Sequence, residues 1–222
     1  MISDESPVLS PNISGNPLPQ SFYARPARVV AQELLGKRLV RLWQGQRLSG
    51  LIVETEAYCD SDEPDLGCHG SKNNGAPTGR NAVMFGPAGF AYVYFTYGMH
   101  WMFNVVTGQP GKANAVLIRA LQPDEGEAVM AHQRAGRPRR QWTNGPAKLA
   151  QALAIDAALN GANLFQPGGV IWMEEGLTPL PAEICSGPRV GLGQTPEPWY
   201  SMPWRFWLCQ NPFVSPHPPS PR

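Results

Sequence analysis

Two glutamates and a tyrosine alternate in the segment LIVETEAY, residues 51–58. The segment has the apolar and β-branched composition of a strand, and successive side chains of a strand point to opposite faces. Strict alternation therefore places Glu54, Glu56 and Tyr58 on one face together with Ile52. The opposite face, which we expect to pack in the core, holds the other four residues: Leu51, Val53, Thr55 and Ala57.

The two carboxylates are expected about 7 Å apart, the spacing of same-face neighbours along a strand. At that distance one ionised carboxylate can take a proton from water, or the two can work as an acid-base pair. Burying unpaired carboxylates is costly, so this face must meet water, cations or a ligand. On residue types alone, an edge strand with a solvated acidic face is an open alternative.

A second group of chemically useful residues lies in GFAYVYFTYGMHWMFNVV, residues 89–106. Aromatic and β-branched residues on either side of Tyr97 and the glycine after it predict a hairpin. Tyr92 and Tyr94 share one face of its first strand, and Tyr97 is expected to project from the turn. With the acidic strand and His69 in a nearby loop, this arrangement fits a protein that wedges into DNA and stacks a base between aromatic rings.

Basic residues give a weaker indication of the same kind. The chain has 18 Lys and Arg against 17 Asp and Glu, so its overall charge points to no nucleic-acid or membrane partner. Two basic clusters could line a phosphate-binding face, although solvated loops and helix ends commonly look the same. They consist of Arg134, Arg137, Arg139 and Arg140, and of Arg25, Arg28, Lys37, Arg38 and Arg41.

The four cysteines show no CxxC pair and no spacing typical of structural zinc, so reduced thiols are expected at Cys59, Cys68, Cys185 and Cys209. No metal and no cofactor are predicted. The start of the chain lacks the pattern of a signal peptide, and no segment is apolar for long enough to span a bilayer. We therefore expect a cytoplasmic protein, associated with the nucleoid if the source is bacterial.

The elements that must position these residues follow no regular alternation of strand and helix. Apolar, turn and capping patterns predict a helix over 26–35, a hairpin over 39–58, a long loop over 59–80, and helices within 123–136 and 144–155. Further strands are expected in 114–121, 169–174, 188–193 and 204–208. This order favours an α+β fold: a single domain on a curved, mainly antiparallel sheet with flanking helices and a protruding β-hairpin.

Five blocks of the sequence resemble the alkyladenine (3-methyladenine) DNA glycosylase family: LIVETEAY, RNAVMFGPAGFAYVYFTYGMHWMFNVV, VLIRAL, GPAKLAQALAI and PRVGLG. The similarity runs from about residue 22 to residue 214. We therefore expect a DNA glycosylase domain over 21–214, between flexible tails at 1–20 and 215–222. We also expect a monomer that acts on double-stranded DNA containing damaged purines, without membrane association.

The resemblance implies a role for each matching residue. Glu56 is implied to be the general base that activates water, and Arg119 to hold the site together near that water. Four positions are implied to enclose or select the extruded base: Tyr58, His69, Tyr94 and Asn104. Tyr97 is implied to enter the minor groove and fill the gap left in the stack. Glu54 has no implied role beyond supporting its strand.

These roles predict hydrolysis of an N-glycosylic bond, which passes through a sugar with oxocarbenium character and so calls for a carboxylate beside C1′. Alkylated purines such as 3-methyladenine are cationic and leave easily, whereas hypoxanthine is neutral and needs more help. Two rival functions stay open: a glycoside hydrolase that uses Glu54 and Glu56 as its pair, and a non-catalytic nucleic-acid-binding module. Two stretches depart from the family pattern, residues 67–70 around His69 and residues 78–81.

Overall fold

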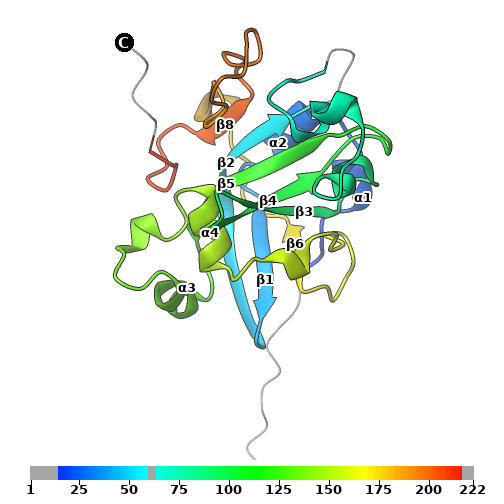
Figure 1. The fold of residues 1–222 in the computed structure, drawn as a ribbon. Helices are drawn as coiled ribbons and strands as arrows, with labels where there is room; N and C mark the ends of the chain where they lie inside the picture. The colour runs from blue at the N-terminus through cyan, green and yellow to red at the C-terminus, as the bar shows by residue number, and fades with distance from the viewer. Residues whose placement is uncertain (1–14, 60–63, 217–222) are drawn as a thin grey trace, which may run out of the picture.

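The structure of the chain is a computed structural model that describes residues 15–59 and 64–216 (Figure 1). The expected tails at 1–20 and 215–222 lie mostly outside these residues, so their flexibility stays a prediction. Leu18 and Ser215 fall within the expected tails, yet both side chains are buried. The packed structure therefore includes residues beyond the expected domain of 21–214. No helix in the described part of the chain is long and apolar enough to cross a membrane.

Short helices and longer strands make up the described residues. The α-helices are α1 (Gln20–Tyr23), α2 (Ala27–Glu33), α3 (Glu127–Gln133) and α4 (Pro146–Ala152). Single 3₁₀ turns cover His69–Ser71, Asn73–Gly75, Ala82–Phe85, Arg139–Gln141, Ala157–Leu159 and Pro181–Glu183. The strands are β1 (Arg38–Trp43), β2 (Gln46–Tyr58), β3 (Ala91–Thr96), β4 (His100–Val106), β5 (Ala115–Pro123), β6 (Ile171–Glu174), β7 (Ile184–Gly187) and β8 (Arg205–Leu208).

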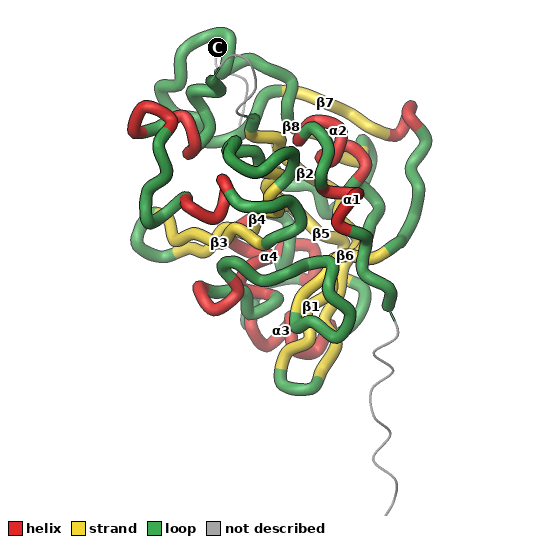
Figure 2. The backbone as a smooth tube through the Cα atoms, turned by 90° about the vertical axis from the view of Figure 1, so that its right-hand side faces the viewer, coloured by secondary structure: helices red, strands yellow, loops and turns green. Residues whose placement is uncertain are grey.

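These strands form one curled antiparallel sheet (Figures 1 and 2). Its main path runs β3-β4-β5-β2-β1-β6, and β8 pairs with both β2 and β7. Helix α2 packs on β2, β5 and β8, while α4 packs on β4 and β5. The predicted α+β fold on a curved antiparallel sheet is therefore confirmed.

The strand that carries the two glutamates is interior to the sheet. Because β2 pairs with β1, β5 and β8, the edge-strand alternative is wrong. Two register shifts between β2 and β5 leave Val53 and Arg119 without a partner in that ladder. A bulge of this kind re-aims side chains, and here Ile52 packs in the main core while Val53 packs in a smaller cluster with Phe213. Strict alternation was therefore wrong for Ile52 and Val53.

The β3-β4 hairpin, which the sequence predicts, turns at Tyr97 and Gly98. Their φ angles are 52° and 67°, and left-handed φ at both central residues is what a type I′ hairpin turn requires. Glycine adopts such a φ freely, whereas a tyrosine does so rarely. The turn leaves the Tyr97 side chain 77% exposed. An uncommon backbone conformation thus presents an aromatic ring to solvent.

The expectation of a strand over 188–193 is wrong. These residues form a loop, and the strand β7, which the sequence analysis did not anticipate, comes just before them. Gly191 and Gly193 have φ angles of 80° and 59°, which interrupt extended backbone. The amide of Val190 also binds a side chain of β2 instead of a neighbouring strand. The composition of 188–193 favours a strand, but these residues form a loop whose Val190 amide binds Glu56.

The cysteines also differ from the expectation of reduced thiols. Cys185 and Cys209 form a disulfide, whereas Cys59 and Cys68 are free and buried. Pairing of β7 with β8 brings the Cα atoms of Cys185 and Cys209 to 5.2 Å, a distance at which a disulfide can form. The spacing of the four cysteines along the sequence does not indicate that Cys185 and Cys209 lie close together.

Candidate active site

Glu56 lies on β2 with no exposed surface, and three groups hold its carboxylate. Its Oε1 accepts the Val190 amide at 2.6 Å and lies 3.1 Å from Nη1 of Arg119. Its Oε2 accepts the Tyr58 hydroxyl at 2.8 Å. These partners come from β2, β5 and the loop at 188–193, and they fix the orientation that a general base needs.

Arg119 links the two glutamates. It is the bulge residue of β5, and its Nε donates to Oε1 of Glu54 at 2.8 Å while its Nη1 faces Glu56. Burial by itself lowers the pKa of this guanidinium, but Glu56 and Glu54 outweigh burial and raise it. Arg119 is therefore a fixed cation between two carboxylates. The structure brings Arg119 and Glu56 together, and their catalytic roles stay predictions.

Glu54 is fully buried and has more hydrogen-bond donors around it than Glu56. Its Oε1 accepts from Nε of Arg119 at 2.8 Å, from Nε of Arg205 at 2.6 Å and from the Ser215 hydroxyl at 2.8 Å. Its Oε2 accepts the Ser215 amide at 2.7 Å. Burial raises the pKa of Glu54, but Arg119, Arg205 and Ser215 hold it below its ordinary value. Glu54 is therefore ionised and enclosed.

A buried ion pair holds the loop that binds Glu56. Nη1 and Nη2 of Arg189 lie 2.5 Å and 2.8 Å from the two carboxylate oxygens of Asp65, and both side chains are fully buried. Arg189 also donates to the carbonyl of Ala57 at 3.1 Å and stacks on the Tyr58 ring at 4.8 Å. Sequence reasoning singled out neither Asp65 nor Arg189 for the site, because no motif joins two residues so far apart in the chain.

An aromatic cavity of about 490 Å³ lies beside the β3-β4 hairpin, within the usual size range of small-molecule sites. All the residues that the resemblance implies for base binding line it, together with Tyr97 and Arg119. Tyr58, Arg119 and Val190 all line the cavity and all bind Glu56, so the buried carboxylate lies directly behind the cavity wall. The cavity therefore offers a flat ligand both aromatic surfaces and a nearby carboxylate.

His69 stands in this cavity as a neutral ring. Its centroid lies 4.6 Å from that of Tyr94 in an edge-on arrangement, and its Nδ1 lies 3.0 Å from the Tyr92 hydroxyl. Burial, assisted by Arg80 and Lys72, lowers the pKa of His69 to about 4. Tyr92 was not among the predicted site residues, although its position two before Tyr94 on one strand face was a usable signal.

The two stretches that depart from the family pattern support His69. The Asn81 side chain donates to the carbonyl of His69 at 2.9 Å and accepts from the amide and hydroxyl of Thr78 at 2.6 and 2.9 Å. In the other stretch, a Cβ at Gly70 would lie 2.0 Å from the Cβ of Ala113, so only glycine fits there. Both stretches therefore still hold the backbone of the loop that carries His69.

The remaining base-binding candidates are also anchored. The side-chain amide of Asn104 donates to the carbonyl of Tyr92 at 3.0 Å across the β3-β4 pair. Burial, followed by the nearby charge of Glu56, raises the pKa of Tyr58 well above its ordinary value, so its hydroxyl keeps the proton that it donates to Glu56. Burial likewise raises the pKa of Tyr94 to about 12.

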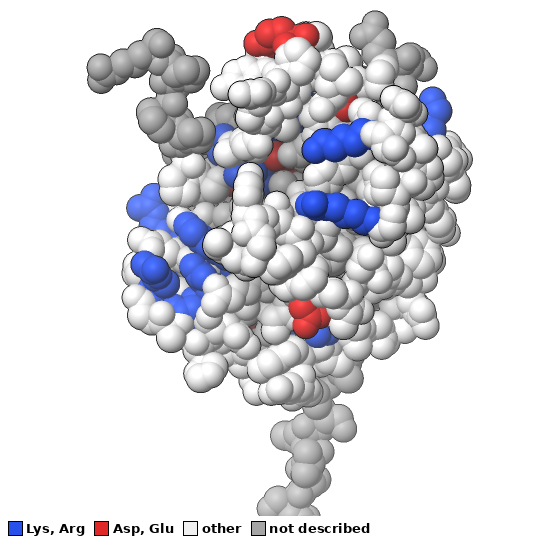
Figure 3. Space-filling view, in the orientation of Figure 1, with Lys and Arg blue, Asp and Glu red and all other residues white. Residues whose placement is uncertain are grey.

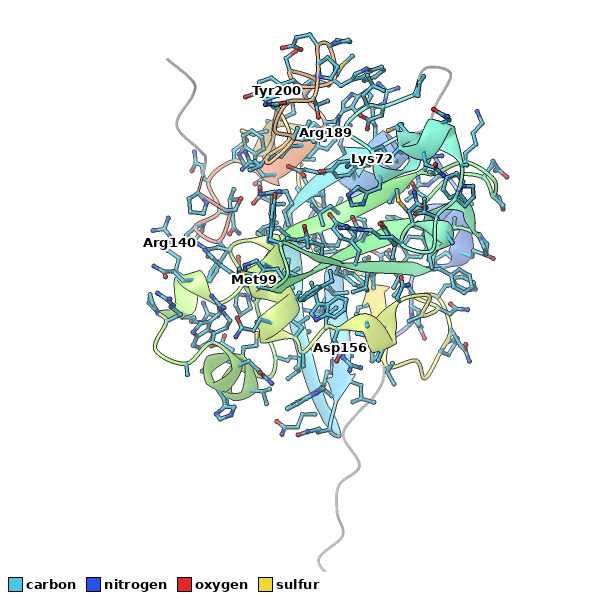
Figure 4. All side chains as sticks on the ribbon, in the orientation of Figure 1. Lys72, Met99, Arg140, Asp156, Arg189 and Tyr200 are labelled. Atoms are coloured by element: carbon cyan, nitrogen blue, oxygen red, sulfur yellow. A yellow bond between two sulfur atoms is a disulfide. The ribbon has the colours of Figure 1, made fainter. Side chains whose placement is uncertain are left out.

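The hairpin tip is an exposed apolar surface beside this cavity. Tyr97 is 77% exposed, Met99 is 66% exposed and Phe95 is 43% exposed. Figure 4 shows Met99 on the viewed face, with Arg140 to one side of it and Lys72 to the other. Exposed apolar side chains gathered in this way commonly mark a surface that contacts another molecule.

Both basic clusters contain ion pairs, and in the one at 134–140 Arg139 pairs with Glu127. Lys and Arg side chains gather in patches on the face viewed in Figure 3, and Arg140 lies on that face (Figure 4). In the cluster near the start of the chain, the ion pairs are Arg25 with Glu33, Lys37 with Glu175, and Arg38 with Asp124. Surface pairing of this kind accounts for these three residues without a phosphate. Within the described residues, no group of three or more His, Cys, Asp or Glu side chains is placed to hold a metal ion.

The fold and the site together describe an enzyme that could receive an extruded base next to a fixed carboxylate. A family model described as methylpurine-DNA glycosylase matches residues 21–212 of the chain. The chain therefore belongs to the methylpurine-DNA glycosylase family. It is a DNA glycosylase, an enzyme of base excision repair, as the sequence predicted.

Relatives agree with this assignment. A protein of Carboxydothermus hydrogenoformans named "Putative 3-methyladenine DNA glycosylase" is 46% identical over 198 residues, which cover 89% of this chain and 98% of the relative. A protein of Myxococcus xanthus with the same name is 47% identical, covering 93% of this chain and 97% of the relative. A third protein of that name, from Methanocella arvoryzae, is 44% identical over 91% of this chain and 97% of its own length.

Proposed function

We propose that the protein flips alkylated or deaminated purines, of the 3-methyladenine and hypoxanthine type, out of duplex DNA. Water activated by Glu56 then hydrolyses the N-glycosylic bond and leaves an abasic site. The observation that carries this proposal is the position of Glu56, held by three donors directly behind an aromatic cavity. The names of the relatives support 3-methyladenine as a substrate.

Extrusion of the base is assigned to the hairpin. Tyr97 is exposed at the turn and also lines the cavity, so its ring can enter the duplex where the flipped nucleotide leaves. Flipping costs a few kcal/mol, and less at a damaged pair, which favours damaged bases from the start. The wedge keeps the vacated stack filled while the base occupies the cavity.

Recognition of the base is assigned to the cavity walls. Rings at Tyr58, His69 and Tyr94 line the cavity and would provide surfaces for a purine, and Asn104, which also lines it, would disfavour the exocyclic amine of guanine. Because the pKa of His69 is lowered to about 4, its ring adds no positive charge that would repel a cationic alkylated purine at pH 7. The same cavity can therefore accept both cationic and neutral bases.

Hydrolysis is assigned to Glu56 and Arg119. Once the sugar follows its base toward the cavity, the carboxylate of Glu56 stabilises the developing oxocarbenium charge and takes a proton from the attacking water. Arg119 holds Oε1 of Glu56, and the Tyr58 hydroxyl holds Oε2. A cationic leaving group needs only this modest assistance, whereas hypoxanthine depends on it more strongly.

The glycoside hydrolase alternative is disfavoured by the surroundings of Glu54. A glycosidase acid must be protonated before reaction, and it must reach the leaving oxygen. Glu54 has a lowered pKa and is enclosed by Arg119, Arg205 and Ser215. It is therefore unsuited to be the acid of a pair with Glu56.

The proposal is tested with duplex oligonucleotides that each contain one modified purine, with the free base measured by chromatography. We expect Glu56→Gln to bind the lesion duplex but to lose about 10²-fold or more in single-turnover release, the usual contribution of a general base. Glu175→Gln, at an exposed glutamate paired with Lys37, is the matched control and should release base normally. Full activity of Glu56→Gln, or binding without release by the wild type, would refute the mechanism.

A further inference from the structure

Glu54 is the least explained charged residue of the site. It is as buried as Glu56 and, like Glu56, it is not itself a lining residue of the cavity. Its oxygens are taken by four donors, one of which is Nε of the lining residue Arg119. Burying a carboxylate is costly, and a strand can be supported by apolar side chains at lower cost. The presence of a second buried carboxylate two residues before the proposed base therefore needs a reason.

The charges around the two glutamates balance. Arg119 lies on β5 and Arg205 on β8, where Arg205 is the Cα partner of Glu56, and both are nearly as buried as the glutamates. Among the described residues, two carboxylates and two guanidiniums therefore share one buried cluster in which the charges balance. Without Glu54 the same cluster would carry a net positive charge next to Glu56.

Within the part of the chain that the structure describes, no other unpaired charge contacts the two glutamates, and Arg80 lies over the Tyr94 ring. Tyr58 and Tyr94 keep their protons because burial, with Glu56 next in effect, raises the pKa of each. Ser215 is neutral, and Arg189, which also lies near Glu56, is paired with Asp65. Among the described residues, Glu54 is thus the carboxylate that balances the second guanidinium of this cluster.

We propose that Glu54 is a positioning and charge-compensating residue for the hydrolysis. It binds Nε of Arg119, directs Nη1 of Arg119 toward Glu56, and cancels the positive charge that would oppose a cationic sugar. This inference rests on the proposed role of Glu56. Arg119 can then orient Glu56 without making the site repel the oxocarbenium charge that forms beside it. The neutral cluster leaves the negative charge of Glu56 available to the reaction.

The size of the effect follows from Coulomb's law. One unit charge about 10 Å from the sugar, at an effective dielectric constant of about 20, changes the rate by roughly tenfold. Glu54→Gln should therefore lower single-turnover base release about tenfold at pH 7. It should also move the acid limb of the pH-rate profile to lower pH by about one unit, since a site with net positive charge resists protonation.

Arg205 offers the opposite perturbation. Arg205→Met leaves Arg119 and both glutamates in place, so the cluster becomes negative and the acid limb should move to higher pH. The double variant Glu54→Gln/Arg205→Met restores neutrality and should return the acid limb toward its wild-type position. Thermal unfolding of each variant is measured in parallel. If Glu54→Gln does not fold, Arg205→Met alone decides the sign of the effect.

A merely structural role gives different results. It predicts lower stability and a rate that falls equally at every pH, with the double variant no better than the single ones. Such a pattern, or an acid limb that Arg205→Met leaves unmoved, would overturn the inference. If the wild type releases base, Glu56→Gln does not, and the limbs fail to move as stated, this inference fails while the proposed function stands. A wild type that releases no base overturns both.

Discussion

The ion pair between Asp65 and Arg189 should be one of the most sensitive points of the fold. Both side chains are fully buried, and the pair ties the loop before the first 3₁₀ turn to the loop at 188–193. Asp65→Asn keeps the shape of the side chain but leaves the guanidinium of Arg189 buried without its carboxylate. Breaking a buried pair in this way costs about 3–5 kcal/mol.

The expected loss can be read as a shift of melting temperature. For a domain of this size each kcal/mol lowers Tm by roughly 2–4 °C, so Asp65→Asn should lower Tm by roughly 6–20 °C. The matched control is Glu33→Gln, which breaks the pair with Arg25 at the surface, where the two side chains are 34% and 48% exposed. A surface pair contributes about 0–1 kcal/mol, so the control should shift Tm by no more than about 4 °C.

The assay is thermal unfolding followed by circular dichroism, with denaturant titration as a second measure. The double variant Asp65→Asn/Arg189→Met should recover part of the loss, because it removes the unpaired charge that the single variant leaves behind. Equal shifts in Asp65→Asn and Glu33→Gln would refute the assignment of a stability role to the buried pair. A double variant less stable than Asp65→Asn would show that packing of Arg189, and not its charge, is the stabilising feature.

Three further predictions concern the site. Tyr97→Ala should weaken binding and base release on duplex DNA more than on single-stranded DNA, because only the duplex needs a wedge; equal losses on both substrates would point to a packing role. Folding lowers the pKa of His69 from an ordinary 6.5 to about 4, so the unfolded chain takes up the proton first as pH falls. The free energy of unfolding should therefore decline between about pH 6.5 and about pH 4. His69→Gln should flatten that decline in unfolding titrations. The enzyme should be monofunctional, with no lysine that attacks the sugar to form a Schiff base. Lys148, whose pKa is lowered mainly by burial, donates to Asn144 at 2.8 Å at the start of a helix. Borohydride should therefore trap no protein-DNA adduct, and chelators should not reduce activity.

Much of the sheet could be predicted because its signals are local. Alternation and turn residues mark the β1-β2 and β3-β4 hairpins, and Pro26 with the glycine after the helix marks α2. The bulge between β2 and β5 could not be predicted, since it depends on the pairing of two strands and not on either one alone. The same holds for the disulfide between Cys185 and Cys209, which depends on the β7-β8 pair.

The candidate site could be predicted where the resemblance implies a chemical role for a side chain. Glu56, Tyr97 and the cavity rings carry residue types that a strand or turn does not require for its own stability, and the family resemblance identified them. Asp65 and Arg189 were missed because their pairing joins distant segments and fills no catalytic motif. Such residues support the reactive groups through a contact that exists only in the folded chain.

The loop at 188–193 shows why a failed strand prediction can mark function. A strand there would engage the Val190 amide in a ladder with a neighbour, and Glu56 would lose the donor that holds its Oε1 at 2.6 Å. The positive φ angles of Gly191 and Gly193 prevent that pairing, and Arg189 anchors the loop from inside. The local composition favours extended backbone, and the tertiary contacts override it at the point where the proposed base must be oriented. The conflict between local preference and observed structure therefore coincides with the contact that orients the proposed base.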